Sequence, residues 1–143
     1  MTAVVNRLDT DADPATVFDH VSDLRTEVGW NPAARRIDLL GPEPVGAGSR
    51  FAASYRGTGR GTAEIVEYAR PTHWRTRCRF RGVDVDIVGR VEPRGRGTHL
   101  TLTLELAAGR ALRPLLPVMA AGLRVAGRAN MRRLGRLLSA PEV

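Results

Sequence analysis

Residues 98–106 alternate strictly between apolar and polar side chains. Leucine stands at positions 100, 102, 104 and 106, and His99, Thr101, Thr103 and Glu105 stand between these leucines. Because successive side chains of a β-strand point to opposite faces, this pattern predicts a strand with one buried and one solvated face. Such a strand belongs to an antiparallel sheet whose apolar face is covered by another element of the chain.

The preceding part of the chain continues this pattern as short strand-like runs from about Arg36 to Ala107. Val83, Val85 and Ile87 alternate with acidic residues in the same way. Turn residues separate the runs, for example at 57–59 and 95–97, where glycines flank a single residue. Together these features predict a meander of antiparallel hairpins.

Helical regions flank the meander. Residues 3–9 predict a first strand, after which Asp13 and Pro14 predict the capped start of a helix that ends before Gly29. A long helix is predicted from Leu112 to Leu138, with one apolar face and with Arg124, Arg128 and Arg132 turned away from it. That face comprises Leu112, Leu115, Leu116, Met119, Leu123, Ala126, Asn130, Leu134 and Leu137. The chain is therefore expected to fold as an α+β protein.

The formal net charge of +7 raises the question of an anionic partner. However, all 22 basic residues are arginine, which indicates a bias in codon usage and lowers the weight of charge alone. A single cysteine, Cys78, excludes an internal disulfide and a cysteine-rich zinc site. No His, Asp and Glu cluster has metal-ligand spacing, so no metal or cofactor is expected. We expect a soluble, cytoplasmic protein, because no leader or membrane-spanning stretch is present.

Arginine also alternates along residues 72–82, at positions 75, 77, 79 and 81. Asp84 and Asp86 follow a tight turn near Gly82, so a hairpin would place them across from or diagonal to Arg79 and Arg77. This basic stripe is therefore interpreted as the solvated face of a strand, partly neutralised by its neighbour.

Several short segments, in their order along the chain, match one known superfamily. They are Ala12–Phe18, Val21–Leu24 followed by Trp30-Asn31-Pro32, Gly46–Phe51, Glu67–Pro71 and Gly97–Thr101. The chain resembles the SRPBCC superfamily, also called START-like or helix-grip proteins, which includes polyketide cyclase/dehydrase-like proteins and the birch pollen allergen. The resemblance implies one domain over residues 1–143. In it a curved antiparallel sheet of about seven strands wraps around the long C-terminal helix, and two short helices follow the first strand.

The resemblance also implies a cavity between the sheet and the long helix. The residues expected to bind a ligand there are Trp30, Phe51, Tyr55, Trp74, Thr76, Cys78, Phe80, Val85, Ile87, Leu102, Met119, Leu123 and Asn130. This mostly apolar composition with a few polar groups is typical of ligand pockets. The same residues could instead pack into a solid core, since cores and apolar pockets share a composition.

Candidates for catalysis are Glu64, Tyr55 and Asn130. Asn130 stands within the apolar stripe of the helix and needs a partner, for which a neighbouring strand or water is an alternative to a ligand. Around residues 62–68 either Thr62, Glu64, Val66 and Tyr68 or Ala63, Ile65 and Glu67 face inward. If Glu64 faces inward, desolvation would raise its pKa and suit it to acid or base chemistry. The histidines form no hydrolase constellation.

Three functions remain open at this point. The leading hypothesis is binding of a small hydrophobic ligand, such as a lipid, a sterol or a polyketide-like molecule. The alternative is a cyclase/dehydrase-type enzyme acting in the same cavity without a metal or a covalent intermediate. A second alternative is an interaction module in which Arg124, Arg128 and Arg132 contact an anionic membrane or RNA, although the sequence holds no specific nucleic-acid motif.

Overall fold

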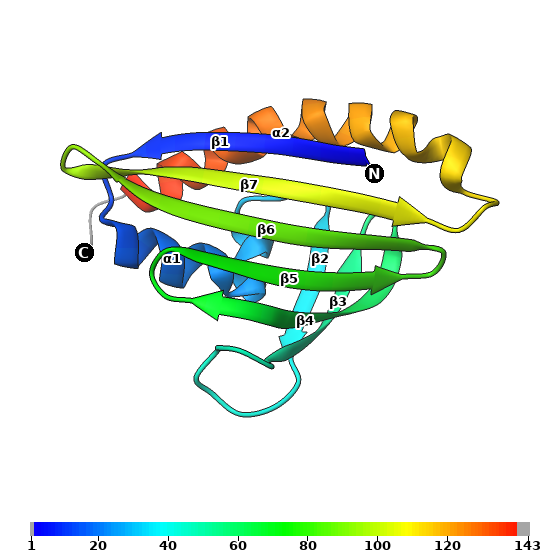
Figure 1. The fold of residues 1–143 in the computed structure, drawn as a ribbon, viewed down its shortest axis with the longest axis horizontal. Helices are drawn as coiled ribbons and strands as arrows, with labels where there is room; N and C mark the ends of the chain where they lie inside the picture. Colours follow the sequence, from blue (N-terminus) through cyan, green and yellow to red (C-terminus); the bar gives the residue numbers. More distant parts are fainter. Residues whose placement is uncertain (1, 140–143) are drawn as a thin grey trace.

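The computed structural model describes residues 2–139, which form a seven-stranded sheet and a long C-terminal helix (Figure 1). The strands are β1 (Thr2–Thr10), β2 (Ala34–Leu39), β3 (Arg50–Tyr55), β4 (Gly59–Ala69), β5 (His73–Phe80), β6 (Val83–Arg94) and β7 (Gly97–Ala108). The helices are α1 (Pro14–Ser22), α2 (Leu116–Ser139) and the 3₁₀ segments η1 (Leu24–Gly29) and η2 (Arg113–Leu115).

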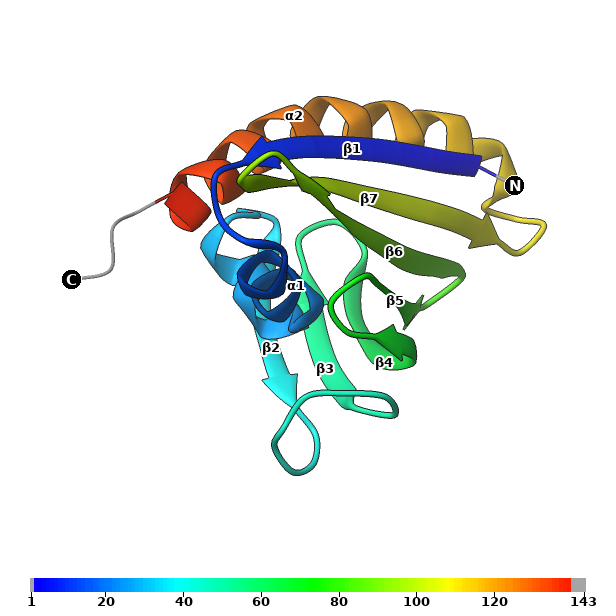
Figure 2. The same cartoon turned by 60° about the vertical axis from the view of Figure 1, so that its left-hand side comes forward.

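The sheet is antiparallel throughout, in the order β1-β7-β6-β5-β4-β3-β2 (Figure 2). Each strand of the meander pairs with the next, and β1 closes the far edge by pairing with β7, where Leu8 lies opposite Leu100. The leucines at 100, 102 and 106 are buried, as their alternation predicts. The expected α+β helix-grip architecture is therefore confirmed.

The short helices begin where capping residues are available. The Asp13 side chain accepts a hydrogen bond from the Thr16 backbone N–H, and Pro14 occupies the first turn of α1. The predicted first helix does not continue to Gly29 as one unit, because Asp23 ends α1 and caps η1 through the Arg25 N–H.

The long helix differs from the prediction at both ends of its apolar face. Pro114 lies in η2, so α2 begins at Leu116 and not at Leu112. Leu115 and Leu137 were expected on the buried face but are exposed. Leu115 lies in the 3₁₀ turn, where the 3.6-residue spacing of the helix is not kept, and Leu137 lies near Gly29 outside the sheet contacts.

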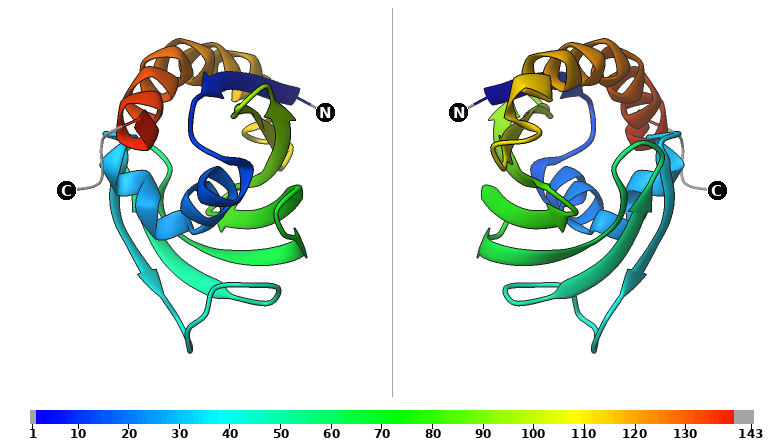
Figure 3. Two further views of the ribbon diagram at one scale, coloured as in Figure 1. Left: turned by 90° about the vertical axis from the view of Figure 1, so that its left-hand side faces the viewer. Right: turned by 90° about the vertical axis from the view of Figure 1, so that its right-hand side faces the viewer.

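The sheet curves so that β1 and β7 lie under α2 while β2 lies beside η1 (Figure 3). Buried residues gather in three clusters between these layers. One joins α1 to the middle of the sheet around Trp74, a second fills the bend of β2–β5 around Phe51, and a third joins β1 and β7 to the start of α2. The concave face between the three clusters is where the cavity lies.

The arginine stripe of β5 lies on the convex face, opposite acidic residues of β6. Arg77 is paired with Asp86 and Arg79 with Asp84, as the hairpin predicts. Arg75 donates to Asp86 at 2.8 Å and to Glu105 of β7 at 2.7 Å. The stripe is therefore partly neutralised within the sheet, at Arg75 and Arg77.

Candidate ligand-binding cavity

A cavity of about 620 Å³ lies between the concave face of the sheet, η1 and α2. This volume is in the range of pockets for small molecules. The sequence left open whether these residues line a cavity or fill a solid core, and the structure has a cavity that is partly open to solvent. Most of the wall is apolar, and its polar members are Asn6, Ser22, Glu27, Asn31, Tyr55, Arg56, Thr58, Thr76, Arg81 and Asn130.

All but one of the residues expected to bind a ligand lie in the wall of this cavity. They are Trp30, Tyr55, Trp74, Thr76, Cys78, Phe80, Val85, Ile87, Leu102, Met119, Leu123 and Asn130. The exception is Phe51, which is fully buried in the cluster around β2–β5. Phe51 shares a strand face with Tyr55, but it lies at the other end of β3, in a buried cluster that includes Leu24, Ile37 and Ile65.

Glu64 does not point into the cavity, because the inward side chains of this part of β4 are Ala63 and Ile65. Glu64 is exposed on the convex face, in register with Arg50 and Arg77. A bulge between Ile65 and Glu67 then shifts the alternation, so that Tyr68 packs inward and Glu67 stays exposed. Neither alternation considered for residues 62–68 therefore holds over the whole segment, and Glu64 is excluded as an acid or base of the cavity.

Asn130 has a partner on its own helix. Its Oδ1 accepts a hydrogen bond from Arg133 Nη1 at 3.1 Å, one turn later in α2. The expected partner on a neighbouring strand is therefore not the one observed. Asn130 remains in the cavity wall, where it is 9% exposed.

The main polar feature of the cavity is Glu27, which the sequence did not single out. The Tyr55 hydroxyl donates a hydrogen bond to Glu27 Oε1, and Asn31 Nδ2 donates to Glu27 Oε2 at 2.7 Å. Burial raises the pKa of the Glu27 carboxyl, and the two hydrogen bonds oppose this shift only in part. Desolvation, followed by the neighbouring Glu27 charge, also raises the pKa of Tyr55, so Tyr55 acts as a donor.

A signal for Glu27 does exist in the sequence. It is an acid four residues before Asn31, the spacing at which side chains meet on a helical turn, and it stands between the apolar residues Leu24 and Trp30. The missing information was that the Tyr55 side chain, at the end of β3, reaches η1 and brings its hydroxyl to the carboxylate.

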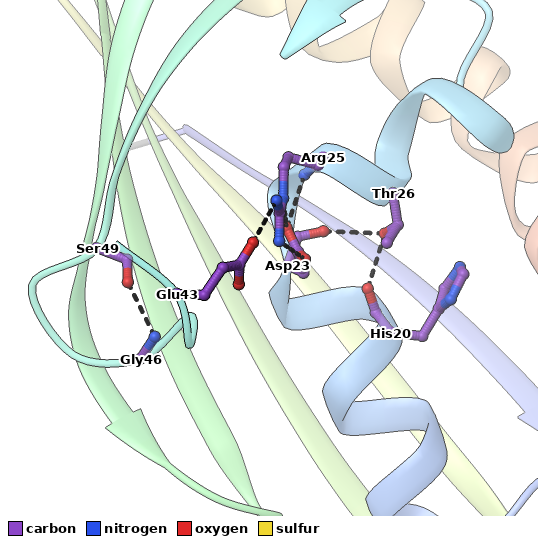
Figure 4. A network of polar contacts seen from close by, with 7 residues as sticks. All are labelled: His20, Asp23, Arg25, Thr26, Glu43, Gly46 and Ser49. Carbon is purple, nitrogen blue, oxygen red and sulfur yellow. Dashed lines mark hydrogen bonds and ion pairs between the residues drawn. The ribbon is translucent and has the colours of Figure 1, made fainter. Parts of the chain in front are cut away.

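The backbone that carries Glu27 is held by the polar network in Figure 4. Arg25 donates to Asp23 at 2.8 Å and to Glu43 of the β2–β3 loop at 2.7 Å. The Thr26 hydroxyl donates to the carbonyl oxygens of His20 and Asp23 at 2.7 and 2.9 Å. These contacts fix η1 against the end of α1 and therefore set the position of Glu27.

Other reactive groups do not form a catalytic constellation. Cys78 is buried, and desolvation raises the pKa of its thiol to about 12, so it is a poor nucleophile. Burial lowers the pKa of His20, which does not line the cavity. Within residues 2–139 no three His, Cys, Asp or Glu side chains gather as metal ligands would.

Arg124, Arg128 and Arg132 are exposed on the outer side of α2, away from the cavity. Arg124 donates to the carbonyl oxygen of Ala3 on β1 at 3.3 Å. In the part of the chain that the structure covers, no helix has the length and apolar character needed to cross a membrane. None of the comparisons below points to a membrane or RNA partner.

Solved structures from several sources share this fold. MLL2253 from Mesorhizobium loti is 16% identical, with a TM-score of 0.75 over 99% of this chain and 100% of that one. CV1439 from Chromobacterium violaceum is 15% identical, with a TM-score of 0.70 over 99% and 100% of the two chains. Ara h 8.0201 is 13% identical, with a TM-score of 0.68 over 96% of this chain and 97% of that one. At these identities the likeness concerns the fold alone.

No curated protein matches the chain. A family model, however, matches nearly all of it, over residues 1–139. The model agrees with the helix-grip fold, with the neighbouring structures and with the resemblance to the SRPBCC superfamily, which is thereby confirmed. The chain belongs to the family described as polyketide cyclase / dehydrase and lipid transport.

Proposed function

We propose that the protein binds one small hydrophobic molecule in the cavity between the sheet and α2. The observation that carries this proposal is a largely apolar cavity of about 620 Å³, partly open to solvent, between the sheet and α2. A concave, mostly apolar site of this size is typical of sites that bind small molecules. The family description, which includes lipid transport, supports the same function.

The direct test is native mass spectrometry of gently purified protein, followed by binding titrations with fatty acids, sterols and aromatic polyketides. We expect a bound apolar molecule at one per chain, or saturable binding of at least one class. If no class binds, the proposal is wrong.

A second candidate function is a cyclase/dehydrase-type reaction in the same cavity. It is favoured by Glu27, a carboxyl group with a raised pKa in an apolar wall beside the Tyr55 hydroxyl. Such a group can take a proton from a bound polyketide-like substrate and return it. Because Glu64 lies outside the cavity, Glu27 replaces it as the candidate acid or base.

The two functions differ in their response to Glu27→Gln. A catalyst would lose turnover of its substrate while still binding it, whereas a carrier protein has no turnover to lose. If Glu27→Gln leaves every tested conversion unchanged, the enzymatic candidate is wrong. Glu64→Gln is the matched control, because Glu64 lies on the convex face.

A further inference from the structure

The Glu27 carboxyl has unused capacity to accept hydrogen bonds. Its two oxygens offer about four acceptor positions, of which Tyr55 and Asn31 fill one each. Glu27 also lines the cavity, so the remaining positions can be reached by a molecule bound there. Buried polar groups are normally satisfied, and a ligand that brings a donor would complete this one.

The charged residues of the cavity wall restrict what kind of hydrogen-bond donor a ligand can bring to Glu27. The lining contains one acid, Glu27, and two cations, Arg56 and Arg81, which are exposed in the turns after β3 and β5. A ligand carboxylate beside Glu27 would bring acceptors and no donor. A ligand cation would share the cavity wall with Arg56 and Arg81, in a chain of net charge +7. A ligand with a neutral hydrogen-bond donor is disfavoured by neither of these effects.

Glu27 and its partner Tyr55 lie at one end of the cavity. Tyr55 is the last residue of β3, and its ring packs against Phe80 at the end of β5, with ring centroids 5.6 Å apart. Trp74 lies at the opposite end of β5 from Phe80, and its neighbours in the cavity wall include Ile87 and Leu102. A ligand that donates to Glu27 can therefore extend its apolar body along β5 toward Trp74.

We propose that the ligand is an apolar molecule with a neutral hydroxyl group, which donates to Glu27 while the apolar body lies against Trp74, Ile87 and Leu102. This inference rests on the proposed function, since it names the ligand class of the same cavity. It separates hydroxylated ring compounds and alcohols from fatty acids, which carry no neutral donor at neutral pH.

Four probes with one rigid apolar body test the inference by fluorescence titration of the wild-type protein at pH 7. They are 1-hydroxypyrene, 1-methoxypyrene, 1-pyrenecarboxylic acid and 1-pyrenemethylamine. We expect 1-hydroxypyrene to bind about tenfold more tightly than its methyl ether, because the ether has no hydroxyl hydrogen to donate to Glu27; tenfold corresponds to about 1.4 kcal/mol. The acid and the amine should both bind more weakly than the hydroxyl compound.

Variants then assign the preference to Glu27. Glu27→Met should reduce the difference between the hydroxyl compound and the ether to within about twofold, while the ether keeps its affinity. Tyr55→Phe frees one acceptor position on Glu27 and should keep the preference, which provides a second test if Glu27→Met folds poorly. Glu64→Met is the control and should change neither affinity.

The outcomes separate the inference from the proposed function. If the ether binds as tightly as the hydroxyl compound, or if the acid or the amine binds most tightly, the inference is wrong but the cavity still binds apolar molecules. If the preference survives Glu27→Met, Glu27 is not its source and the inference is also wrong. If none of the four probes binds, both the inference and the proposed function are contradicted.

Discussion

The indole of Trp74 lies across Gly89, its partner on the neighbouring strand, where a Cβ would come within 2.3 Å of the ring. Trp74 is 1% exposed and makes an edge contact with Phe18 of α1, with ring centroids 5.2 Å apart. The absence of a side chain at position 89 therefore allows the Trp74 ring to occupy the space over this position of the sheet.

Gly89→Ala should destabilise the protein, because the new methyl group and the Trp74 ring cannot occupy the same space. Overpacking of this kind costs about 1–3 kcal/mol. Urea unfolding followed by tryptophan fluorescence gives the free energy of unfolding. An unchanged value would show that Trp74 has room to move.

Gly122→Leu should weaken ligand binding while making the protein more stable. Gly122 lines the cavity on α2, and a Cβ there would meet no atom within 4 Å. Leucine favours a helix over glycine by roughly 0.5–1 kcal/mol, and its side chain would occupy space needed by a ligand. Val118→Leu, on the exposed face of the same helix, is the control. Lost binding together with lost stability would instead indicate a damaged fold.

Glu27→Gln should change how stability depends on pH. The folded state raises the pKa of Glu27 above its ordinary value of 4.5, so the folded protein binds this proton more tightly than the unfolded chain. The stabilisation that the bound proton of Glu27 gives to the folded state is fully present below pH 4.5. It is lost as the pH rises through the raised pKa.

The melting temperature of Glu27→Gln should therefore equal or exceed that of the wild type at neutral pH, and its relative advantage should shrink as the pH falls toward 4.5. The difference between Glu64→Gln and the wild type should stay nearly constant. An advantage of Glu27→Gln that grows at low pH would contradict burial as the cause of the shift.

On the convex face, Arg75→Ala should cost more stability than Arg77→Ala or Arg79→Ala. Arg75 is 24% exposed and joins Asp86 to Glu105. Its removal leaves Glu105 without a cation and Asp86 with Arg77 alone, which should cost about 1–3 kcal/mol. Arg77 and Arg79 should cost about 0.2–1 kcal/mol each. Affinity for any cavity ligand should not change in the three variants, and a large loss would mean that this face takes part in binding.

Much of the fold follows from periodicity and turn residues. The alternation in β7, the cap at Asp13 and the glycine turns depend on local backbone preferences, which a sequence displays directly. The Arg77–Asp86 register was also predictable, because a tight turn fixes the pairing of a hairpin.

The parts that escaped prediction depend on contacts between distant segments. Glu27 becomes a site residue only because the Tyr55 hydroxyl at the end of β3 reaches it, and Phe51 is buried in the cluster of β2–β5 and does not line the cavity. The bulge after Ile65 changes which of the following side chains point inward, and the sequence of residues 62–68 contains no signal that predicts it. Hydrophobic patterns show which residues are inside, but not whether they touch one another or a void.

Ligand binding in the cavity can be followed residue by residue in a methyl NMR titration with the tightest-binding compound of the ligand panel. The cavity account predicts saturable shifts at Ile87, Leu102 and Met119, which line the void. Val66 and Val125, which are exposed outside it, should stay unchanged. Shifts confined to Val66 or Val125, or shifts that do not saturate, would contradict ligand binding in the cavity.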